Sequence, residues 1–436
     1  MSVIHANIRG GLAAFLLLLV LSAQEAAGQF PVLPNAVPSE ERKLIVNYAT
    51  FPSTDPSRVR LEVYYQVYNY GLEFERVSDQ LFRARYVTTV RLIDRDADTV
   101  VSSSRQEREA TVDQLLKTKS TGDFRTAQVN FEVPPGKYEV GFLLETIGSR
   151  SVLKRDFNID IKGFGNKNPQ LSDVELVQAA GPMPDGEVPE DFAKGDLMII
   201  PSLTGTFSSE DQGKIMFYLE ISRGSDSASE VTIETSLRRG SRGMVYRDSL
   251  TAPLNERITR QLREISLEDY MPGEYELSVS LHGRRYKKLD EKKVSFRVPW
   301  TSTAILRHDW DAALDQLELI TDRNDVKPMR KIEDLGERVK AIERFWAERD
   351  PDPSTSINEM KVVFYHRIDA ANRLFSVLNR EGWRTDRGRV LIRYGEPDQI
   401  DDFPLVPDRY PYQEWHYYRD GRYRKFVFVD VNEDGE

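Results

Sequence analysis

The side chains best suited to bind an anionic group lie close together near the end of the chain. Four arginines and three carboxylates occur between residues 384 and 398, namely Arg384, Arg387, Arg389, Arg393, Asp386, Glu396 and Asp398. A guanidinium presents a planar fork of donors that fits a carboxylate. Together with Trp383, these residue types predict a groove that binds an anionic group or a peptide strand.

The same segment has two other interpretations. In a purely structural one, Trp383 fills a helix–sheet interface, Thr385 or Asp386 caps a turn, and Gly395 opens a turn that ends a strand. In the other, Asp386, Arg387, Glu396 and Asp398 form the polar cluster of an extracytoplasmic hydrolase. A hydrolase requires carboxylates that converge in a concave pocket, whereas a scaffold carries ion-paired carboxylates on its surface.

A candidate metal site lies at the end of the sequence. Asp430, Asn432 and Asp434 alternate with other residues and precede Gly435, which matches the first half of a calcium-binding loop. A polar turn after a strand has the same composition. Calcium is therefore one of two interpretations, and no other cofactor is expected.

Motifs of known enzyme chemistry are missing from the sequence. It contains no cysteine, which excludes thiol nucleophiles, thiolate metal sites and disulfides. None of its five histidines belongs to an H-E-x-x-H motif, and there is no G-x-S-x-G elbow. His366 and Asp369 have the spacing of a base with an orienting carboxylate, but a surface helix has it too. The sequence favours a non-enzymatic protein.

Two helices are predicted to precede the arginine-rich segment. Apolar residues recur at steps of three and four, which indicates one helix, at Ile332, Leu335, Val339, Ile342 and Phe345. A capping box at 356–359 begins the second. Its expected buried residues are Met360, Val363, Phe364, Ile368, Ala371, Leu374, Phe375 and Leu378. We expect Gly382 to be its left-handed C-cap.

Strands are predicted after Gly382. Val390, Ile392 and Tyr394 alternate on one face, which would place Arg387, Arg389 and Arg393 together on the other. Two further strands are expected at 415–418 and 425–431. The region 300–436 is therefore predicted to be an α+β domain.

The region before residue 300 is predicted to be all-β. β-branched and aromatic runs alternate with turns at 44–48, 60–68, 86–93, 127–133, 138–146 and 157–161. The segment PGKYEV at 135–140 recurs as PGEYEL at 272–277, a domain-sized period. We expect two tandem immunoglobulin- or fibronectin-like β-sandwiches, at 43–163 and 170–299.

The first residues resemble a secretory signal. Arg9 precedes a ten-residue apolar run at 12–21, and small residues follow at 26–28. This run is too short to span a bilayer, which takes about 20 residues. We expect a signal peptide at 1–28, a proline-rich lead-in at 29–42, no transmembrane segment in the mature chain, and a periplasmic or secreted protein.

The charge balance bears on the partner. The net charge is -10, so the excess of lysine and arginine that binds nucleic acid non-specifically is missing. Nucleic acid is therefore set aside. A protein or peptide partner in the cell envelope is expected.

The C-terminal residues resemble a known family. The segments GWRTD at 382–386 and YGEPD at 394–398 are similar to the signature of GWxTD domain proteins, as are the flanks 345–346 and 414–415. The resemblance implies an exported bacterial protein without an established activity, so it supplies no catalytic residue. We expect an envelope interaction or scaffold protein that binds through its C-terminal domain, with a hydrolase of an unknown polymer as the alternative.

Overall fold

The structure, a computed structural model, describes most of the chain after residue 42. It describes residues 43–78, 80–119, 123–165, 167–183, 192–207, 213–224, 229–240, 243–268, 270–299, 309–351, 353, 358–377, 380–403, 410–419 and 422–431. The expected signal peptide and lead-in lie outside these ranges. The chain divides into two compact units. The first consists of residues up to 205, 215–265 and 275–296, and the second of 206–214, 266–274 and 297–436.

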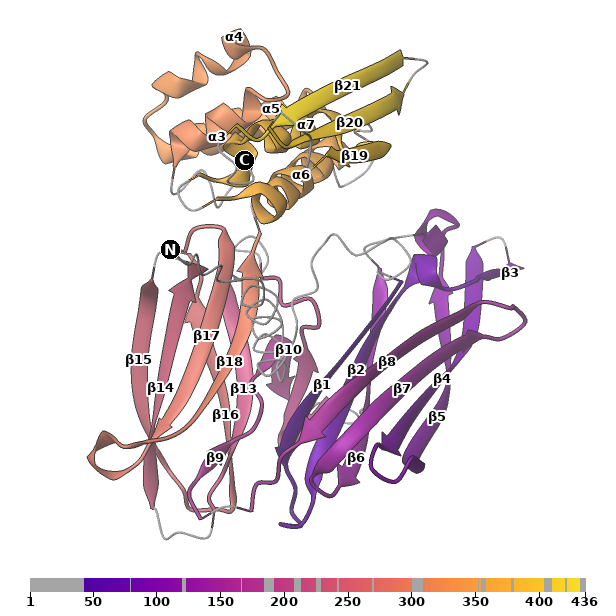
Figure 1. Ribbon diagram of the computed structural model, residues 1–436, viewed down its shortest axis with the longest axis vertical. Coiled ribbons are helices and arrows are strands. Elements are labelled where there is room, and N and C mark those ends of the chain that lie inside the picture. Colours follow the sequence, from indigo (N-terminus) through magenta and orange to yellow (C-terminus); the bar gives the residue numbers. More distant parts are fainter. Residues whose placement is uncertain are drawn as a thin grey trace, which may run out of the picture. The chain divides into compact units, whose positions relative to one another are not determined.

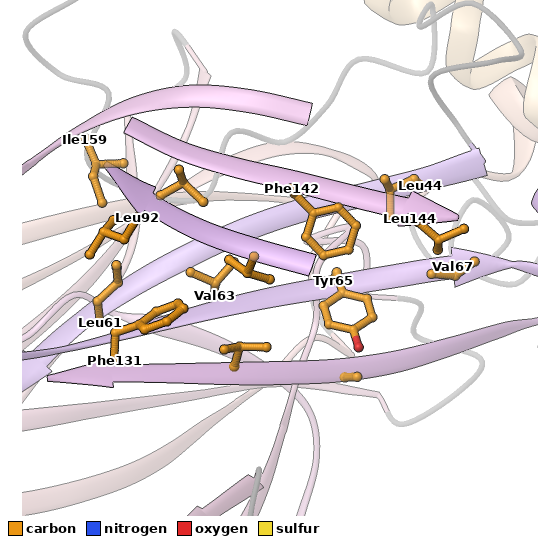
Figure 2. Close-up of a cluster of buried hydrophobic side chains, with 14 of the residues drawn as sticks. Leu44, Leu61, Val63, Tyr65, Val67, Leu92, Phe131, Phe142, Leu144 and Ile159 are labelled. Carbon is orange, nitrogen blue, oxygen red and sulfur yellow. The ribbon is translucent and has the colours of Figure 1, made fainter. Parts of the chain in front are cut away.

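The first unit begins with two antiparallel sheets. One has the strand order β1-β2-β6, from β1 (Leu44–Pro52), β2 (Val59–Tyr68) and β6 (Phe124–Val133). The other has the order β3-β4-β7-β8 with β5 on β4, from β3 (Glu75–Ser78), β4 (Leu81–Asp94), β5 (Thr99–Val112), β7 (Gly136–Thr146) and β8 (Val152–Ile161). Alternate residues of both sheets, among them Val63, Tyr65, Leu92 and Phe142, fill one core between them (Figure 2).

A second pair of sheets follows in the same unit. The order β11-β12-β10-β13-β16, with β9 on β13, is built from β9 (Gln170–Leu171), β10 (Glu175–Pro182), β11 (Ala193–Lys194), β12 (Leu197–Pro201), β13 (Lys214–Ser222) and β16 (Ile258–Ser266). The order β15-β14-β17-β18 is built from β14 (Glu230–Arg239), β15 (Met244–Pro253), β17 (Gly273–His282) and β18 (Lys288–Val298). Apolar residues of both sheets are buried, including Phe217 and Leu277.

The two repeated segments occupy equivalent places. The first copy begins β7, which pairs with β4 and β8. The second begins β17, which lies between β14 and β18. Tyr138 and Tyr275, the tyrosines of the two copies, are both buried.

The second unit combines helices with a three-stranded antiparallel sheet (Figure 1). Its elements are α3 (Trp310–Leu317), α4 (Arg323–Val326), α5 (Leu335–Ala347), α6 (Glu359–Phe375), α7 (Asp386–Tyr394), β19 (Gln399–Phe403), β20 (Tyr412–Arg419) and β21 (Arg422–Val429). Helices and sheet share a core that includes Trp346, Phe364, Trp383, Trp415 and Phe428. The predicted fold class, mainly β with sandwiches and a C-terminal α+β region, is confirmed.

The strand predicted around Val390 is wrong. Residues 386–394 form helix α7, because Thr385 caps its first turn and the buried residues Gly388, Leu391 and Ile392 fall at helical spacing. Arg387 therefore does not share a face with Arg389 and Arg393.

Two details of the preceding helices are also corrected. The N-cap of α6 is Asn358, whose side chain accepts from the backbone N–H of Lys361; the Ser356 proposed for a capping box lies outside the described residues, as does Leu378. Phe364, Ile368 and Ala371 are buried as predicted. Other residues predicted to be buried are exposed, namely Leu335, Met360, Val363 and Leu374.

Gly382 is not a helix C-cap. Helix α6 ends at Phe375, and Gly382 begins a separate 3-10 turn, η8 (Gly382–Arg384). The described residues also form the 3-10 turns η2 (Asn69–Gly71), η3 (Leu116–Lys119), η6 (Arg284–Tyr286) and η7 (Met329–Lys331). None of the helices in the described ranges has both the length and the apolar character that a membrane span requires.

Candidate functional site

The first residues of the GWRTD segment hold η8 against α6. A Cβ atom on Gly382 would lie 1.9 Å from the carbonyl oxygen of Ala371, so only glycine allows this approach. The backbone N–H of Gly382 donates to Ser376 Oγ at 2.8 Å, and that of Trp383 donates to Asn372 Oδ1 at 3.0 Å. Trp383 is 1% exposed and belongs to the core.

The last residues of the segment start helix α7. Thr385 Oγ1 donates to the carbonyl of Gly382 at 2.7 Å and accepts from the backbone N–H of Gly388 at 3.1 Å. A Cβ atom on Gly388 would lie 1.9 Å from the same carbonyl oxygen. Asp386 lies in the first helical turn, where a carboxylate is favourable to the helix dipole. The GWRTD segment therefore connects α6 to α7 through the 3-10 turn η8.

The four arginines have different surroundings. The guanidinium of Arg384 lies 4.0 Å from the ring centroid of Trp383 and within 3.6 Å of carboxylates of Glu381 and Asp315. Arg393 donates to the carbonyl of Leu319. On α7, Arg389 and Arg393 are exposed, whereas Arg387 is half-buried. Arg387 therefore lies on another side of α7 from Arg389 and Arg393.

The carboxylates of the segment lie at opposite ends of α7. Helix α7 separates Asp386 from Glu396 and Asp398 by about 13 Å, given a rise of about 1.5 Å per residue. Asp398 holds β19 to β20, since its Oδ2 accepts from the backbone N–H of Tyr418 and its own N–H donates to the carbonyl of His416. The hydrolase alternative stays a prediction. A binding role for the individual residues stays a prediction.

The calcium loop stays a prediction as well. Asp430 is largely buried, and its backbone N–H donates to the carbonyl of Pro411. Asn432 and Asp434, the other two proposed ligands, lie outside the described residues.

One face of the β19-β20-β21 sheet is turned away from the core. Trp415 and Tyr417 on β20 are buried against the helices, so the residues that alternate with them point the other way. Directly opposed residues of antiparallel strands share a face. The register thus defines an outer sheet face consisting of Gln399, Asp401, Phe403, Tyr412, Glu414, His416, Tyr418, Tyr423, Lys425, Val427 and Val429.

The outer sheet face carries apolar groups at both ends. Tyr418 and Tyr423 stack at 5.2 Å between ring centroids and are 60% and 56% exposed. At the other end, Val427 and Val429 are each 48% exposed. An antiparallel sheet with a solvated face ordinarily alternates apolar-in and polar-out. The exposed tyrosines and valines depart from that pattern.

Polar groups lie between these two ends. His416 Nε2 is 3.1 Å from Asp401 Oδ2 and 3.8 Å from Glu414 Oε2, and Lys425 Nζ is 2.9 Å from Glu414 Oε1. Sequence reasoning missed this group because it depends on the register between β19 and β20. Its one local signal is the Glu-x-His spacing, which puts both side chains on the same face of a strand.

The comparison with protein families supports the sequence resemblance. Residues 307–435 match the family model of the GWxTD domain. The C-terminal region is a GWxTD domain. Its signature residues are those that join α6, η8 and α7. A search of curated proteins found no match.

Solved structures resemble the chain only distantly. A glycosyl hydrolase family 2 member from Bacteroides cellulosilyticus is 10% identical with a TM-score of 0.24, over 55% of this chain and 28% of that chain. The Bacteroides uniformis β-glucuronidase is 9% identical with a TM-score of 0.25, over 55% and 26%. Dimeric latent PorU from Porphyromonas gingivalis is 11% identical with a TM-score of 0.25, over 62% and 21%. The chain thus spans less than a third of each of these proteins.

Proposed function

We propose that this is an exported, non-enzymatic interaction protein whose GWxTD domain binds an extended segment of a partner protein. The observation that carries the proposal is the outer sheet face, where exposed tyrosines and valines lie on neighbouring strands of one sheet. Tyrosine is enriched at protein interfaces because it offers a large apolar surface together with a hydroxyl group. The apolar run at 12–21 supports export to the envelope.

The edge of the sheet gives the partner segment a place to pair. In the described part of the chain, β21 pairs with β20 and ends the strand order β19-β20-β21. An edge strand presents backbone N–H and C=O groups to a further strand. Strand addition supplies affinity through those groups and specificity through alternate side chains.

The composition of β21 suggests what such a segment contains. Its first half is basic, with Arg422, Arg424 and Lys425, and its second half is apolar, with Val427 and Val429. Opposite charges on neighbouring strands attract, and apolar pairs stabilise the sheet. The matching partner is therefore an extended segment with acidic residues at one end and β-branched or aromatic residues at the other.

Co-purification with matched variants tests this proposal. The wild-type chain is compared with Val427→Lys/Val429→Lys on the outer sheet face and with Val245→Lys/Leu250→Lys, which changes equally exposed apolar residues of β15 in the first unit. A third variant, Asp386→Asn/Arg389→Ala, examines α7. Each chain is cross-linked in cells of the source organism, and its folding is checked by circular dichroism.

We expect one partner to be retained by the wild type, the β15 variant and the α7 variant, and lost from the outer-face variant. A partner kept by the outer-face variant contradicts the proposal. Loss confined to the α7 variant would move the binding site to the arginines of the signature.

A further inference from the structure

A histidine and two carboxylates meet in the middle of the outer sheet face. Asp401 on β19 lies directly opposite Glu414 on β20, and His416 follows two residues later on the same face. One ligand atom from each of these side chains lies within 4.8 Å of the other two. The group joins the two neighbouring strands β19 and β20.

The imidazole of His416 is buried although the residue lies on the outer sheet face. The residue is 7% exposed, and its Nε2 is buried without a hydrogen bond. Asp401 Oδ2 lies 3.1 Å from this nitrogen, but the two groups lack the alignment of a hydrogen bond. A buried polar nitrogen left unsatisfied is unfavourable unless a ligand binds it.

Neighbouring side chains orient the group. His416 Nδ1 lies 2.8 Å from Tyr423 Oη. When the ring hydrogen is on Nδ1, this nitrogen donates to Tyr423 and Nε2 directs a lone pair at the two carboxylates. Metal-binding histidines are commonly held in this way. Lys425 contacts Glu414 Oε1, which leaves Oε2 on the side of His416.

We propose that Asp401, Glu414 and His416 bind a divalent transition-metal ion of the Zn²⁺ class. One imidazole with two carboxylates suits Zn²⁺ rather than Ca²⁺ or Mg²⁺, which take oxygen ligands. Tetrahedral Zn²⁺ bonds of about 2.0–2.2 Å place ligand atoms about 3.3 Å apart. The separations of 3.1 and 3.8 Å from His416 Nε2 bracket that value.

The site has an open side. Three protein ligands leave at least one position of a tetrahedral ion for water or for a side chain of a partner. The side chain of Asp401 is 39% exposed, so the ion is reached from solvent. The ion would fasten β19 to β20 on the outer sheet face. This inference does not depend on the proposed partner binding.

Calorimetric titration of the metal-free full chain with ZnCl₂ tests the site, with CaCl₂ and MgCl₂ in parallel. We expect one Zn²⁺ per chain and no binding of the other two ions. The variants Asp401→Asn and His416→Gln should weaken Zn²⁺ binding about ten-fold or more, and Tyr423→Phe about ten-fold. Tyr418→Phe, which removes the neighbouring hydroxyl, should bind as the wild type does.

Two results would overturn the proposal. One is a wild-type chain that does not bind Zn²⁺, and the other is binding that is equally strong in Asp401→Asn and His416→Gln. Asp401→Asn is nearly isosteric at a partly exposed position, so loss of folding does not obscure the comparison. Because the titration uses the purified chain alone, its result is separate from that of the partner experiment.

Discussion

At the scale of single residues, the GWxTD signature is explained by packing and capping. Gly382 and Gly388 are glycines because backbone atoms occupy the space of a side chain. Trp383 fills the core, and Thr385 caps α7. Sequence reasoning anticipated the tryptophan and the capping role of threonine. It could not anticipate the glycine contacts, because Ala371 is eleven residues away in the chain.

A Gly382→Ala variant tests this explanation. The added methyl group has to displace the backbone of α6, so we expect the unfolding free energy of the GWxTD domain to fall by about 3 kcal/mol. All five tryptophans lie at residue 300 or later, so their fluorescence in a urea titration reports this region selectively. Arg389→Ala, at an exposed position of α7 in the same domain, is the control and should unfold like the wild type.

At the scale of elements, local patterns identified buried elements better than exposed ones. The predicted strands with apolar alternation match β1, β2, β4, β6, β7 and β8. Strand β5 was missed because its sequence, TVVSSSRQEREATV, is largely polar and forms a strand through pairing with β4. Helix α7 was taken for a strand because Val390, Ile392 and Tyr394 also fit a period of two.

The end of helix α7 provides a test at this scale. Gly395 has φ 79° and ψ −165°, a conformation open almost only to glycine, and its N–H donates to the carbonyl of Leu391. Gly395→Ala and Gly395→Asn should both destabilise the domain by about 1–3 kcal/mol. Arg389→Ala, at an exposed helical position, should leave the fluorescence midpoint nearly unchanged. Equal midpoints for all three variants would show that this turn is not strained.

At the scale of the whole molecule, contacts between buried charged groups are the feature that is hardest to predict from the sequence. In the first unit, the ammonium group of Lys194 contacts the carboxylate of Glu62 and lies 3.1 Å from that of Glu175, with all three side chains almost fully buried. Lys194 and Glu62 are 132 positions apart. No local sequence pattern predicts such a pairing. The C-terminal domain, by contrast, was predictable from its resemblance to GWxTD proteins.

Burial raises the pKa of the Glu175 carboxyl from 4.5 to about 7, although Lys194 opposes the rise and the Glu62 carboxylate adds to it. Between these pH values the folded chain holds a proton that the unfolded chain has lost. The contribution of Glu175 to stability therefore falls as the pH rises from about 4.5 to 7, by about 3 kcal/mol. Burial alone would raise the pKa of Glu62, but Lys194 and Arg60 lower it overall, so Glu62 is ionised in the folded state across this window.

A Glu175→Gln variant should accordingly lose this pH dependence. We expect the melting temperature of the variant to increase relative to that of the wild type as the pH is raised from 5 to 8. Calorimetry of the full chain measures this difference. Glu132→Gln, an exposed change on β6, should follow the wild type throughout. A constant difference between Glu175→Gln and the wild type would mean that Glu175 is already ionised at pH 5.

Site-specific photo-cross-linking tests partner binding by the GWxTD domain most directly. A photoreactive amino acid is placed at Tyr418 or Val427 on the outer sheet face, or at Val245 on β15, all of them exposed positions. After irradiation in cells of the source organism, we expect the same adduct from positions 418 and 427 and none from 245. Adducts from 245 alone, or equal adducts from all three positions, would contradict a binding role for the outer sheet face.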